Sequence, residues 1–361
     1  MKVLFSTDKL NRGGKEKQLL LIAEGLLKRH HDVLVLSKEK VDHNNFYTEI
    51  GVPVDRIYAY REGNNYGMRK RYVNKVLDFQ PDVMLNFDIM ASLWTEQFSR
   101  ALKKIPTINC TIRGGTPSIS RKSRWLSKLC LRKSKYIVAN SKAGLAMSNI
   151  DQNEYHRVIY NGIDLDYYQN VQPISKEKLL GKKLPADAYI IANVSNLYQY
   201  KGQQTLIEAI AKSNNKNIYL IIIGEGPERA RLQSKIDQQG LTKRVKLLGR
   251  QSNVEQYLKS VDLYVHPSWS EGCSNSILEA MACQLPMVTT REGGTAEIVH
   301  TPTSRFFKKN DANDLSAAID EMMGIHSIKK DGLAAWVKQF EQSNMVDQYE
   351  AFIKKIALNG K

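Results

Sequence analysis

Cysteine is scarce in this 361-residue sequence, and its four positions form no recognisable pattern. Cys110, Cys130, Cys273 and Cys283 include no Cys-x-x-Cys pair and no histidine at metal-ligand spacing. We therefore expect reduced thiols, a cytoplasmic protein and no bound metal or other cofactor. The Gly-x-x-x-x-Gly-Lys-Ser/Thr pattern is absent, and 224–226 lacks the third glycine of the dinucleotide fingerprint. A P-loop NTPase and a dehydrogenase are therefore disfavoured.

Long apolar runs are absent as well. The longest, 218–223, is far shorter than the roughly 20 residues that span a bilayer. The apolar start of the chain is interrupted by Asp8 and Lys9, so we interpret it as a first strand rather than a signal peptide. We predict no membrane-spanning anchor.

Acidic residues are outnumbered, with 37 Asp and Glu against 53 Lys and Arg and a formal net charge of +16. Such an excess favours a polyanionic partner: nucleic acid, an anionic membrane surface or a phosphorylated substrate. No nucleic-acid-binding motif and no interleaved aromatic platform accompany the charge. We do not expect nucleic acid as a partner, although a basic polyanion-binding protein remains the non-enzymatic alternative.

The apolar pattern alternates short strand-like runs with helical periodicity, which indicates an α/β fold with a doubly wound parallel sheet. Two such rounds are separated by a polar stretch at 166–185, where we place the interdomain linker. The length suits two domains. We predict one domain at 1–165, a second at 166–342, and a C-terminal helix at 343–361 that packs back on the first.

Four glycine-containing loops follow predicted strands. In open α/β sheets such loops bring backbone amides close to phosphates. A single glycine after a strand is more often simple turn geometry, so the loops gain weight only together. They are Gly13-Gly14, Lys201-Gly202, Gly224-Glu-Gly226 and Gly293-Gly294.

Two carboxylates, Glu271 and Glu279, lie eight positions apart, one in a Gly/Ser/Asn-rich loop and one in the apolar helix predicted after it. This turn can direct both carboxylates and several backbone N–H groups at one ligand, which we hypothesise to be a nucleotide-sugar. A simpler role stays open for each carboxylate. Ser276-Ile-Leu-Glu279 matches a capping box, and a glutamate before a loop glycine is commonly only solvated.

The run 271–282, with Pro286 and the segment 293–298, resembles the E-x7-E signature of retaining glycosyltransferases of family 4, which have the GT-B fold of two Rossmann-like domains facing a central cleft. The resemblance covers almost the whole chain. Further matching stretches are 13–16, 81–83, 139–141, 161–164, 201–202, 224–227 and 266–268.

The resemblance implies a metal-independent donor site. Glu271 would hold hydroxyls of the donor sugar, Glu279 the ribose, and Lys201 the diphosphate, with the Gly13 and Gly14 amides approaching from the other domain. Asn196 stands near the position where the family usually has an arginine. The remaining residues implied on the donor side are Gly224, Gly272, Cys273, Ser274 and Asn275.

Arg113 lies where the family often has a histidine. It cannot act as a general base because its guanidinium stays protonated. It would bind an acidic or phosphorylated acceptor, or simply stack on its own loop. With Glu271 and Lys201 it completes the predicted catalytic set.

A basic segment at 121–135 has Trp125 near one face and cations around the rest. Arg121, Lys122 and Arg124 are the candidate residues on the acceptor or membrane side. The segment fits a helix lying on an anionic inner membrane surface, but also a Rossmann helix with a solvated basic side.

We predict a retaining glycosyltransferase of the hexosyltransferase type that moves a sugar from a nucleotide-sugar, with UDP-sugars favoured. The acceptor would be a glycan or lipid-linked glycan of bacterial cell-envelope polysaccharide. The enzymatic alternative is a GT-B nucleotide-sugar epimerase or sugar phosphorylase.

Overall fold

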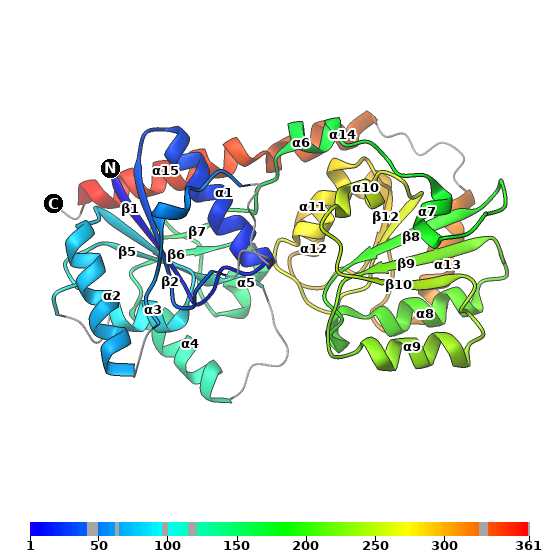
Figure 1. The fold of residues 1–361 in the computed structure, drawn as a ribbon, viewed down its shortest axis with the longest axis horizontal. Helices are drawn as coiled ribbons and strands as arrows, with labels where there is room; N and C mark the ends of the chain where they lie inside the picture. Colours follow the sequence, from blue (N-terminus) through cyan, green and yellow to red (C-terminus); the bar gives the residue numbers. More distant parts are fainter. Residues whose placement is uncertain (42–49, 62–64, 96–99, 115–120, 325–330, 360–361) are drawn as a thin grey trace. The chain divides into compact units, whose positions relative to one another are not determined.

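A computed structural model describes residues 1–41, 50–61, 65–95, 100–114, 121–324 and 331–359 (Figure 1). The chain forms two compact units. Unit 1 contains Met1–Gly162 and Gln342–Lys361, and unit 2 contains Ile163–Glu341. Within the described residues, no helix combines the length and apolarity needed to cross a bilayer.

The sheet of unit 1 is entirely parallel, with strand order β3-β2-β1-β4-β5-β6-β7. Successive residues of β1 point to opposite faces, so Val3 and Phe5 join one core cluster and Leu4 joins another. The strands are β1 Lys2–Thr7, β2 Asp32–Ser37, β3 Ile57–Ala59, β4 Val83–Asn86, β5 Thr107–Ile112, β6 Tyr136–Ala139 and β7 His156–Val158.

Helices cover both faces of this sheet. The helices α1 and α15 supply the core on the Val3 and Phe5 side, whereas α2 packs on the Leu4 side. A buried face on each side is what a doubly wound sheet requires. The helices of unit 1 are α1 Gly14–Lys28, α2 Asn65–Phe79, α3 Ile89–Leu93, α4 Arg121–Lys133, α5 Lys142–Met147 and α15 Gln342–Asn359, with the 3-10 turn η2 Val54–Arg56.

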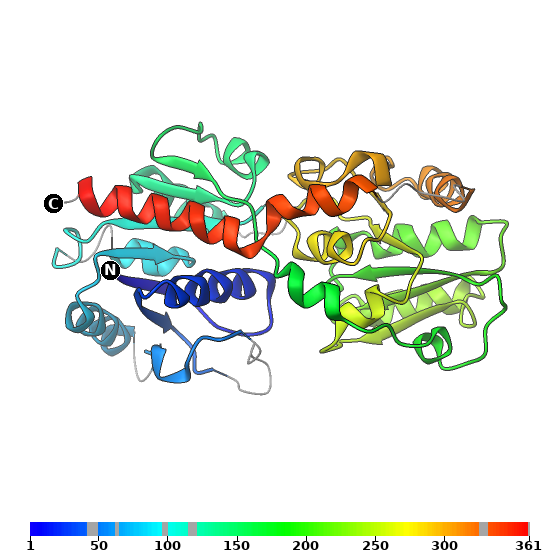
Figure 2. The same cartoon turned by 90° about the horizontal axis from the view of Figure 1, so that it is seen from above.

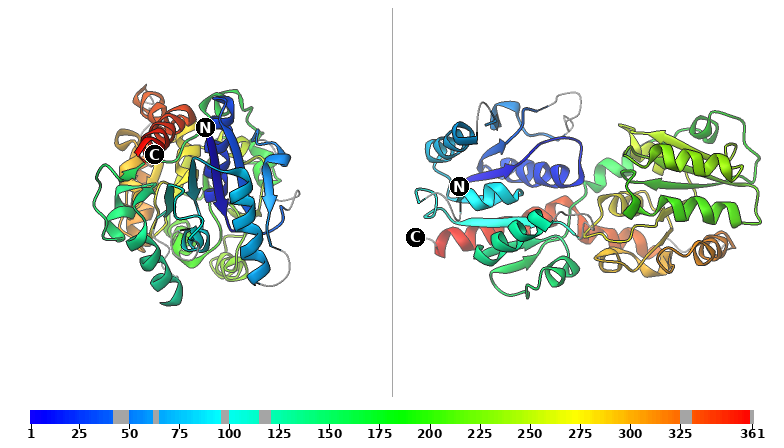
Figure 3. Two further views of the ribbon diagram at one scale, coloured as in Figure 1. Left: turned by 90° about the vertical axis from the view of Figure 1, so that its left-hand side faces the viewer. Right: turned by 90° about the horizontal axis from the view of Figure 1, so that it is seen from below.

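The last helix, α15, packs against α1 in unit 1 (Figures 2 and 3). Its buried stripe includes Met345, Tyr349 and Ile353, at the spacing of one helix face. Arg29, just after α1, forms ion pairs with α15: its guanidinium lies 2.7 Å from the Glu350 carboxylate and 2.7 Å from the Asp347 carboxylate. The C-terminal segment therefore contributes to the core of unit 1.

Unit 2 repeats the parallel arrangement, in the order β10-β9-β8-β11-β12-β13. Its central strands are buried along their length, as expected for a parallel sheet covered on both faces. The strands are β8 Tyr189–Val194, β9 Ile218–Ile223, β10 Val245–Gly249, β11 Leu263–His266, β12 Met287–Thr289 and β13 Ser304–Phe306. The α-helices are α6 Leu165–Asn170, α7 Lys176–Leu180, α8 Gln203–Lys212, α9 Arg229–Gln238, α10 Val254–Leu258, α11 Asn275–Ala282, α12 Thr295–Ile298, α13 Ala312–Gly324 and α14 Asp331–Val337; the 3-10 turns are η4 Gln199–Lys201, η5 Thr301–Thr303 and η6 Lys338–Phe340.

The polar stretch 166–185, which we interpreted as a linker, is part of unit 2 and contains helix α7 and most of α6. Asp164 starts α6 by accepting a hydrogen bond from the Tyr167 amide at 3.0 Å. Both helices are too short to show a helical periodicity in the sequence. The change of unit falls between Gly162 and Ile163.

Each sheet has one point where the strand order reverses. In unit 1 the chain runs from β1 through β2 to β3 and resumes at β4, on the other side of β1. In unit 2 it runs from β8 to β10 and resumes at β11, beside β8. The loops leaving β1 and β4, and those leaving β8 and β11, therefore diverge, and ligands bind where such loops diverge.

Candidate functional site

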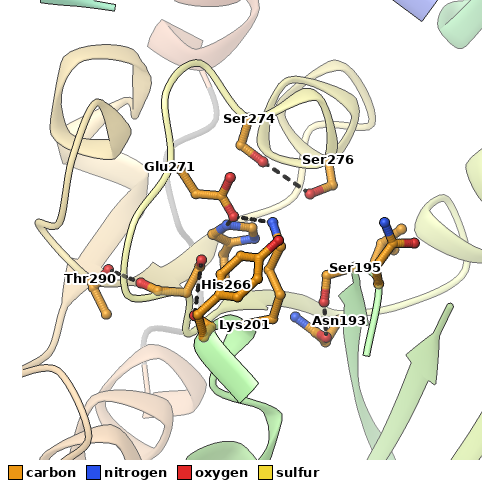
Figure 4. Close-up of polar contacts among 12 residues, drawn as sticks. Asn193, Ser195, Lys201, His266, Glu271, Ser274, Ser276 and Thr290 are labelled. Carbon is orange, nitrogen blue, oxygen red and sulfur yellow. Dashed lines mark hydrogen bonds and ion pairs between the residues drawn. The ribbon is translucent and has the colours of Figure 1, made fainter. Parts of the chain in front are cut away.

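The strongest candidate site lies at the reversal point of unit 2, where one carboxylate contacts a lysine and a histidine side chain (Figure 4). Lys201 closes the η4 turn after β8, and Glu271 lies in the loop after β11. The Lys201 Nζ forms an ion pair with Glu271 Oε1. His266, the last residue of β11, places its Nε2 3.2 Å from the same oxygen.

These three side chains are largely buried, with side-chain exposures of 15% for Lys201, 14% for Glu271 and 1% for His266. Burial alone would raise the pKa of Glu271. The charges and hydrogen bonds of Lys201 and His266 lower it by more, so the pKa is about 2. Glu271 is therefore a carboxylate at neutral pH. Tyr264 OH lies 3.2 Å from His266 Nδ1, which fixes the ring from its other side.

The loop that carries Glu271 is anchored by backbone contacts. The Gly294 amide donates to Glu271 O at 2.8 Å. Gly293 has φ +61, and a Cβ there would collide with the Glu271 backbone. Gly202 has φ +72, and a Cβ on this residue would likewise collide with the Pro267 carbonyl. These two glycines are required because two backbones approach each other, which holds Lys201 and Glu271 in register.

The loop after β8 is fixed by buried amide side chains. Gln203 Nε2 donates to Ser195 Oγ at 2.8 Å and to the Asn196 carbonyl at 3.0 Å. Asn193 accepts from Ser195 Oγ at 3.1 Å (Figure 4). The side chain of Asn196 is exposed. In the predicted phosphate loop at Gly224, the Gly224 amide donates to Gly249 O at 2.9 Å.

Gly272, Cys273, Ser274 and Asn275 lead into α11. The helix begins at Asn275 with Ser274 at the N-cap position, and the Ser274 side chain makes no capping hydrogen bond. The capping-box interpretation of Ser276 and Glu279 is therefore wrong, because Ser276 already lies inside the first turn and Glu279 is the fifth helical residue. The first turn of α11 follows the Glu271 loop directly, and the free N–H groups of a first helical turn can bind an anion.

The charge of Glu279 acts on Tyr168, a relation that the sequence did not suggest. Burial, followed by the charges of Glu279 and its neighbours, raises the pKa of the Tyr168 phenol. Tyr168 comes from α6, which packs against α11. His266 was also missed as a site residue, and its position at the end of β11, directly before the Glu271 loop, is the signal that could have identified it.

The remaining predicted residues belong to unit 1. Gly13 is the N-cap residue of α1 and Gly14 its first residue. The Arg113 guanidinium lies 4.4 Å from the Phe87 ring centroid, and it donates to Cys110 O at 3.0 Å and to Tyr349 OH at 3.2 Å. Arg113 is thus held by Cys110, three residues before it, and by Phe87 and Tyr349 from elsewhere in unit 1. Arg124 is exposed on α4, and the side chains of Arg121 and Lys122 lie outside the described residues.

Two doubly wound parallel sheets, with a cation and carboxylates at a reversal point, define the class of protein. The fold is GT-B, and the chain is similar to HepE from Anabaena, solved in complex with UDP-glucose, with a TM-score of 0.84 at 21% identity. That match covers 98% of this chain and 100% of HepE.

Sequence comparison identifies the family. Residues 12–167 match the model of Glycosyltransferase Family 4, and residues 175–331 match that of Glycosyl transferases group 1. The chain therefore belongs to the family 4/group 1 glycosyltransferases.

Two relatives illustrate the range of the family. The lipopolysaccharide core biosynthesis glycosyltransferase LpsE of Rhizobium meliloti is 30% identical over 170 residues, which span 46% of this chain but only about half, 49%, of LpsE. The N-acetyl-alpha-D-glucosaminyl L-malate synthase of Bacillus anthracis is 24% identical over 284 residues, covering 76% of this chain and 73% of that protein.

Proposed function

We propose that the protein is a retaining glycosyltransferase that transfers a sugar from a nucleotide-sugar, with UDP-sugars favoured, to a glycan or lipid-linked glycan of the bacterial cell envelope. The observation that carries the proposal is the buried arrangement of Lys201, Glu271 and His266 at the reversal point of unit 2. The similarity to LpsE, a glycosyltransferase of lipopolysaccharide core biosynthesis, supports an envelope product. The similarity to HepE, solved with UDP-glucose, supports a UDP-sugar donor.

In the proposed reaction Lys201 supplies positive charge to the leaving diphosphate, so that the departing nucleoside diphosphate is stabilised without a metal ion. Glu271 holds Lys201 in place and accepts hydrogen bonds from hydroxyls of the donor sugar through its remaining oxygen. The amides of 272–275 and the first turn of α11 add partial positive charge. Glu279 holds the ribose hydroxyls. The acceptor hydroxyl oxygen bonds to the anomeric carbon from the same face on which the bond to the phosphate oxygen breaks, and this leaving oxygen takes the proton of the hydroxyl. Attack from that face retains the anomeric configuration.

A thermal-shift panel of UDP-, GDP-, ADP- and CMP-sugars tests the donor. We expect a UDP-sugar to raise the melting temperature most, because a ligand that binds only the folded state stabilises it by mass action. Glu279→Ala should remove most of this shift, because Glu279 is the residue proposed to hold the ribose hydroxyls of the donor. Glu321→Ala, at an exposed position of α13, is the matched control. A flat panel with the unaltered protein would refute the donor assignment.

We further propose that α4 attaches the protein to the cytoplasmic face of an anionic membrane. Trp125 is 62% exposed beside the exposed Arg124 and Lys128, while Cys130 is buried. An exposed tryptophan among cations is typical of helices that lie in a membrane interface. Trp125→Ala should reduce co-sedimentation with vesicles that contain anionic lipid and leave the weak binding to neutral vesicles unchanged. Equal binding of the unaltered protein to both vesicle types would contradict this proposal.

A further inference from the structure

Two cations that the proposed reaction does not use lie at the edge of the unit 2 sheet where its strands end. The strand order β8-β11-β12-β13 fixes the order of the loops along this edge. The loops that leave these strands contain, in the same order, Lys201, Glu271, Arg291 and Lys308. The two additional cations therefore follow strands on the opposite side of β11 from Lys201.

The strand register brings Arg291 and Lys308 close together. Thr289 of β12 pairs with Phe306 of β13, and each is the last residue of its strand. Each cation lies two positions beyond this pair, at the ends of neighbouring strands that are about 4.8 Å apart. Both residues are exposed. A single anion can therefore contact both side chains.

Arg291 is held in place without being neutralised. Its guanidinium carbon lies 4.0 Å from the centroid of the Phe306 ring, and this stacking leaves the N–H groups at the edge of the guanidinium available. Within the residues that the structure describes, neither Arg291 nor Lys308 forms an ion pair or a side-chain hydrogen bond. The adjacent carboxylate of Glu292 is engaged by Lys309, whose Nζ lies 3.5 Å from it. The pair therefore lacks a counter-ion in this part of the chain.

The loop that carries Arg291 is joined to the loop that carries Glu271. Gly293 and Gly294 follow Arg291 by two and three positions, and the Gly294 amide donates to the Glu271 carbonyl at 2.8 Å. A Cβ on Gly293 would collide with the same backbone. Arg291 therefore lies near the residue proposed to hold the hydroxyls of the donor sugar.

We propose that Arg291 and Lys308 bind a carboxylate carried by the donor sugar, so that the transferred residue is a uronic acid. The inference rests on the proposed function, in which Lys201 binds the diphosphate and Glu271 the sugar hydroxyls. The carboxylate of a hexuronic acid and the diphosphate are attached to different carbons of the ring, so separate cations can bind the two anions. The arginine fork matches the two oxygens of a carboxylate, and the lysine adds a point charge.

Isothermal titration calorimetry with UDP-glucuronate and UDP-glucose tests the inference, because the two ligands differ only in a carboxylate that replaces a hydroxymethyl group. We expect the unaltered protein to bind UDP-glucuronate about tenfold more tightly, as a charge-assisted contact would provide. Arg291→Gln should reduce this preference to about twofold or less, because the bidentate contact is lost. Arg291→Lys should give an intermediate preference, since an ammonium keeps the charge without the planar fork.

Lys212→Gln is the matched control, because it removes one positive charge at an exposed position of α8 and should keep the full preference. The melting temperature of each ligand-free variant shows that it is folded. Equal affinity of the unaltered protein for the two nucleotide-sugars, or a preference that survives in Arg291→Gln, would overturn the inference. A preference that is lost equally in Lys212→Gln would also overturn it, because net charge and not a site would then attract the uronate.

The comparison also separates this inference from the proposed function. If Arg291→Gln weakens both nucleotide-sugars equally, Arg291 acts on the nucleoside diphosphate that they share, and only the uronate inference is overturned. If neither nucleotide-sugar binds, the proposed UDP-sugar donor is refuted, and saturation-transfer NMR with D-glucuronate and methyl α-D-glucopyranoside decides the carboxylate site. A stronger glucuronate signal that is lost in Arg291→Gln would leave that site standing, and equal signals would overturn it as well.

Discussion

Lys201→Met is expected to lower turnover with a nucleotide-sugar donor about 100- to 1,000-fold. Lys201 is the cation proposed to stabilise the departing diphosphate, and removing one such transition-state contact in a buried site typically raises the barrier by roughly 3 to 4 kcal/mol. Methionine preserves most of the volume of the side chain, so the loss should follow from charge and not from packing. Turnover is measured as release of the nucleoside diphosphate, with donor in excess.

The same substitution should destabilise unit 2, because it leaves the Glu271 carboxylate buried without its cation. Breaking a buried ion pair at one partner costs about 3 to 5 kcal/mol of unfolding free energy, and protonation of the carboxylate reduces this loss. Adding Glu271→Gln to Lys201→Met should restore much of the stability, since no unpaired charge is then buried. Turnover should stay low in the double variant.

Lys212→Met is the matched control, because Lys212 is exposed at the end of α8 and takes no part in the site. Both activity and stability of this variant should resemble those of the unaltered protein. Lys201→Met with full turnover would remove Lys201 from the diphosphate site. A double variant that regains turnover together with stability would mean that the single substitution acted only by disturbing the fold.

Much of the fold could be predicted because parallel sheets and their helices leave strong periodic signals. The buried run at 218–223 becomes β9, and the stripe with Met345, Tyr349 and Ile353 becomes the buried face of α15. The α7 helix and the start of α6 were missed because elements of five or six residues complete at most two turns. The start of α11 was misplaced because Ser276 and Glu279 happen to have capping-box spacing.

The candidate site could be predicted where its residues are close in sequence, as with Glu271 and the loop that follows it. The surroundings of each site residue could not be predicted from the sequence, because they are formed by chain segments that meet only in the folded unit. Lys201 and Glu271 are 70 positions apart, and Tyr168 reaches Glu279 from a segment that looked like a linker. Arg113 was interpreted from its place in a motif, whereas its partner Tyr349 lies 236 positions away.

The two units place similar chemistry at equivalent points of their sheets. In unit 2 the lysine after β8 pairs with the carboxylate after β11, and in unit 1 Lys15 pairs with Asp8 near Asp88, which follows β4. The two clusters differ in which charge has two partners. The unit 2 carboxylate is shared by a lysine and a histidine, whereas the unit 1 lysine is shared by two carboxylates. The unit 1 cluster therefore carries a net negative charge, which the unit 2 cluster does not.

Glu271 should make the stability of unit 2 fall as the solution is acidified. Its pKa is about 2 in the folded protein against an ordinary value of 4.5, so the unfolded chain takes up the proton first. The resulting contribution, on the order of 3 kcal/mol, is fully present above pH of about 4.5 and is lost as the pH falls toward 2. Other carboxylates titrate in the same range, so the comparison must be made against Glu271→Gln.

The expected signature is a difference in unfolding free energy between the unaltered protein and Glu271→Gln that is constant from pH 6 to about pH 5 and then shrinks as the pH falls to 3. Urea denaturation at each pH gives the difference, and hydrogen exchange in β8 and β11 assigns it to unit 2. Glu321→Gln should show no such trend, because the Arg305 and Glu321 side chains are both about half exposed. In a Lys201→Met background the trend should weaken, since the cation that lowers the pKa of Glu271 is gone. A difference independent of pH would mean that Glu271 titrates normally in the folded protein, and the ion pair with Lys201 would then be too weak to preorganise the site for a diphosphate.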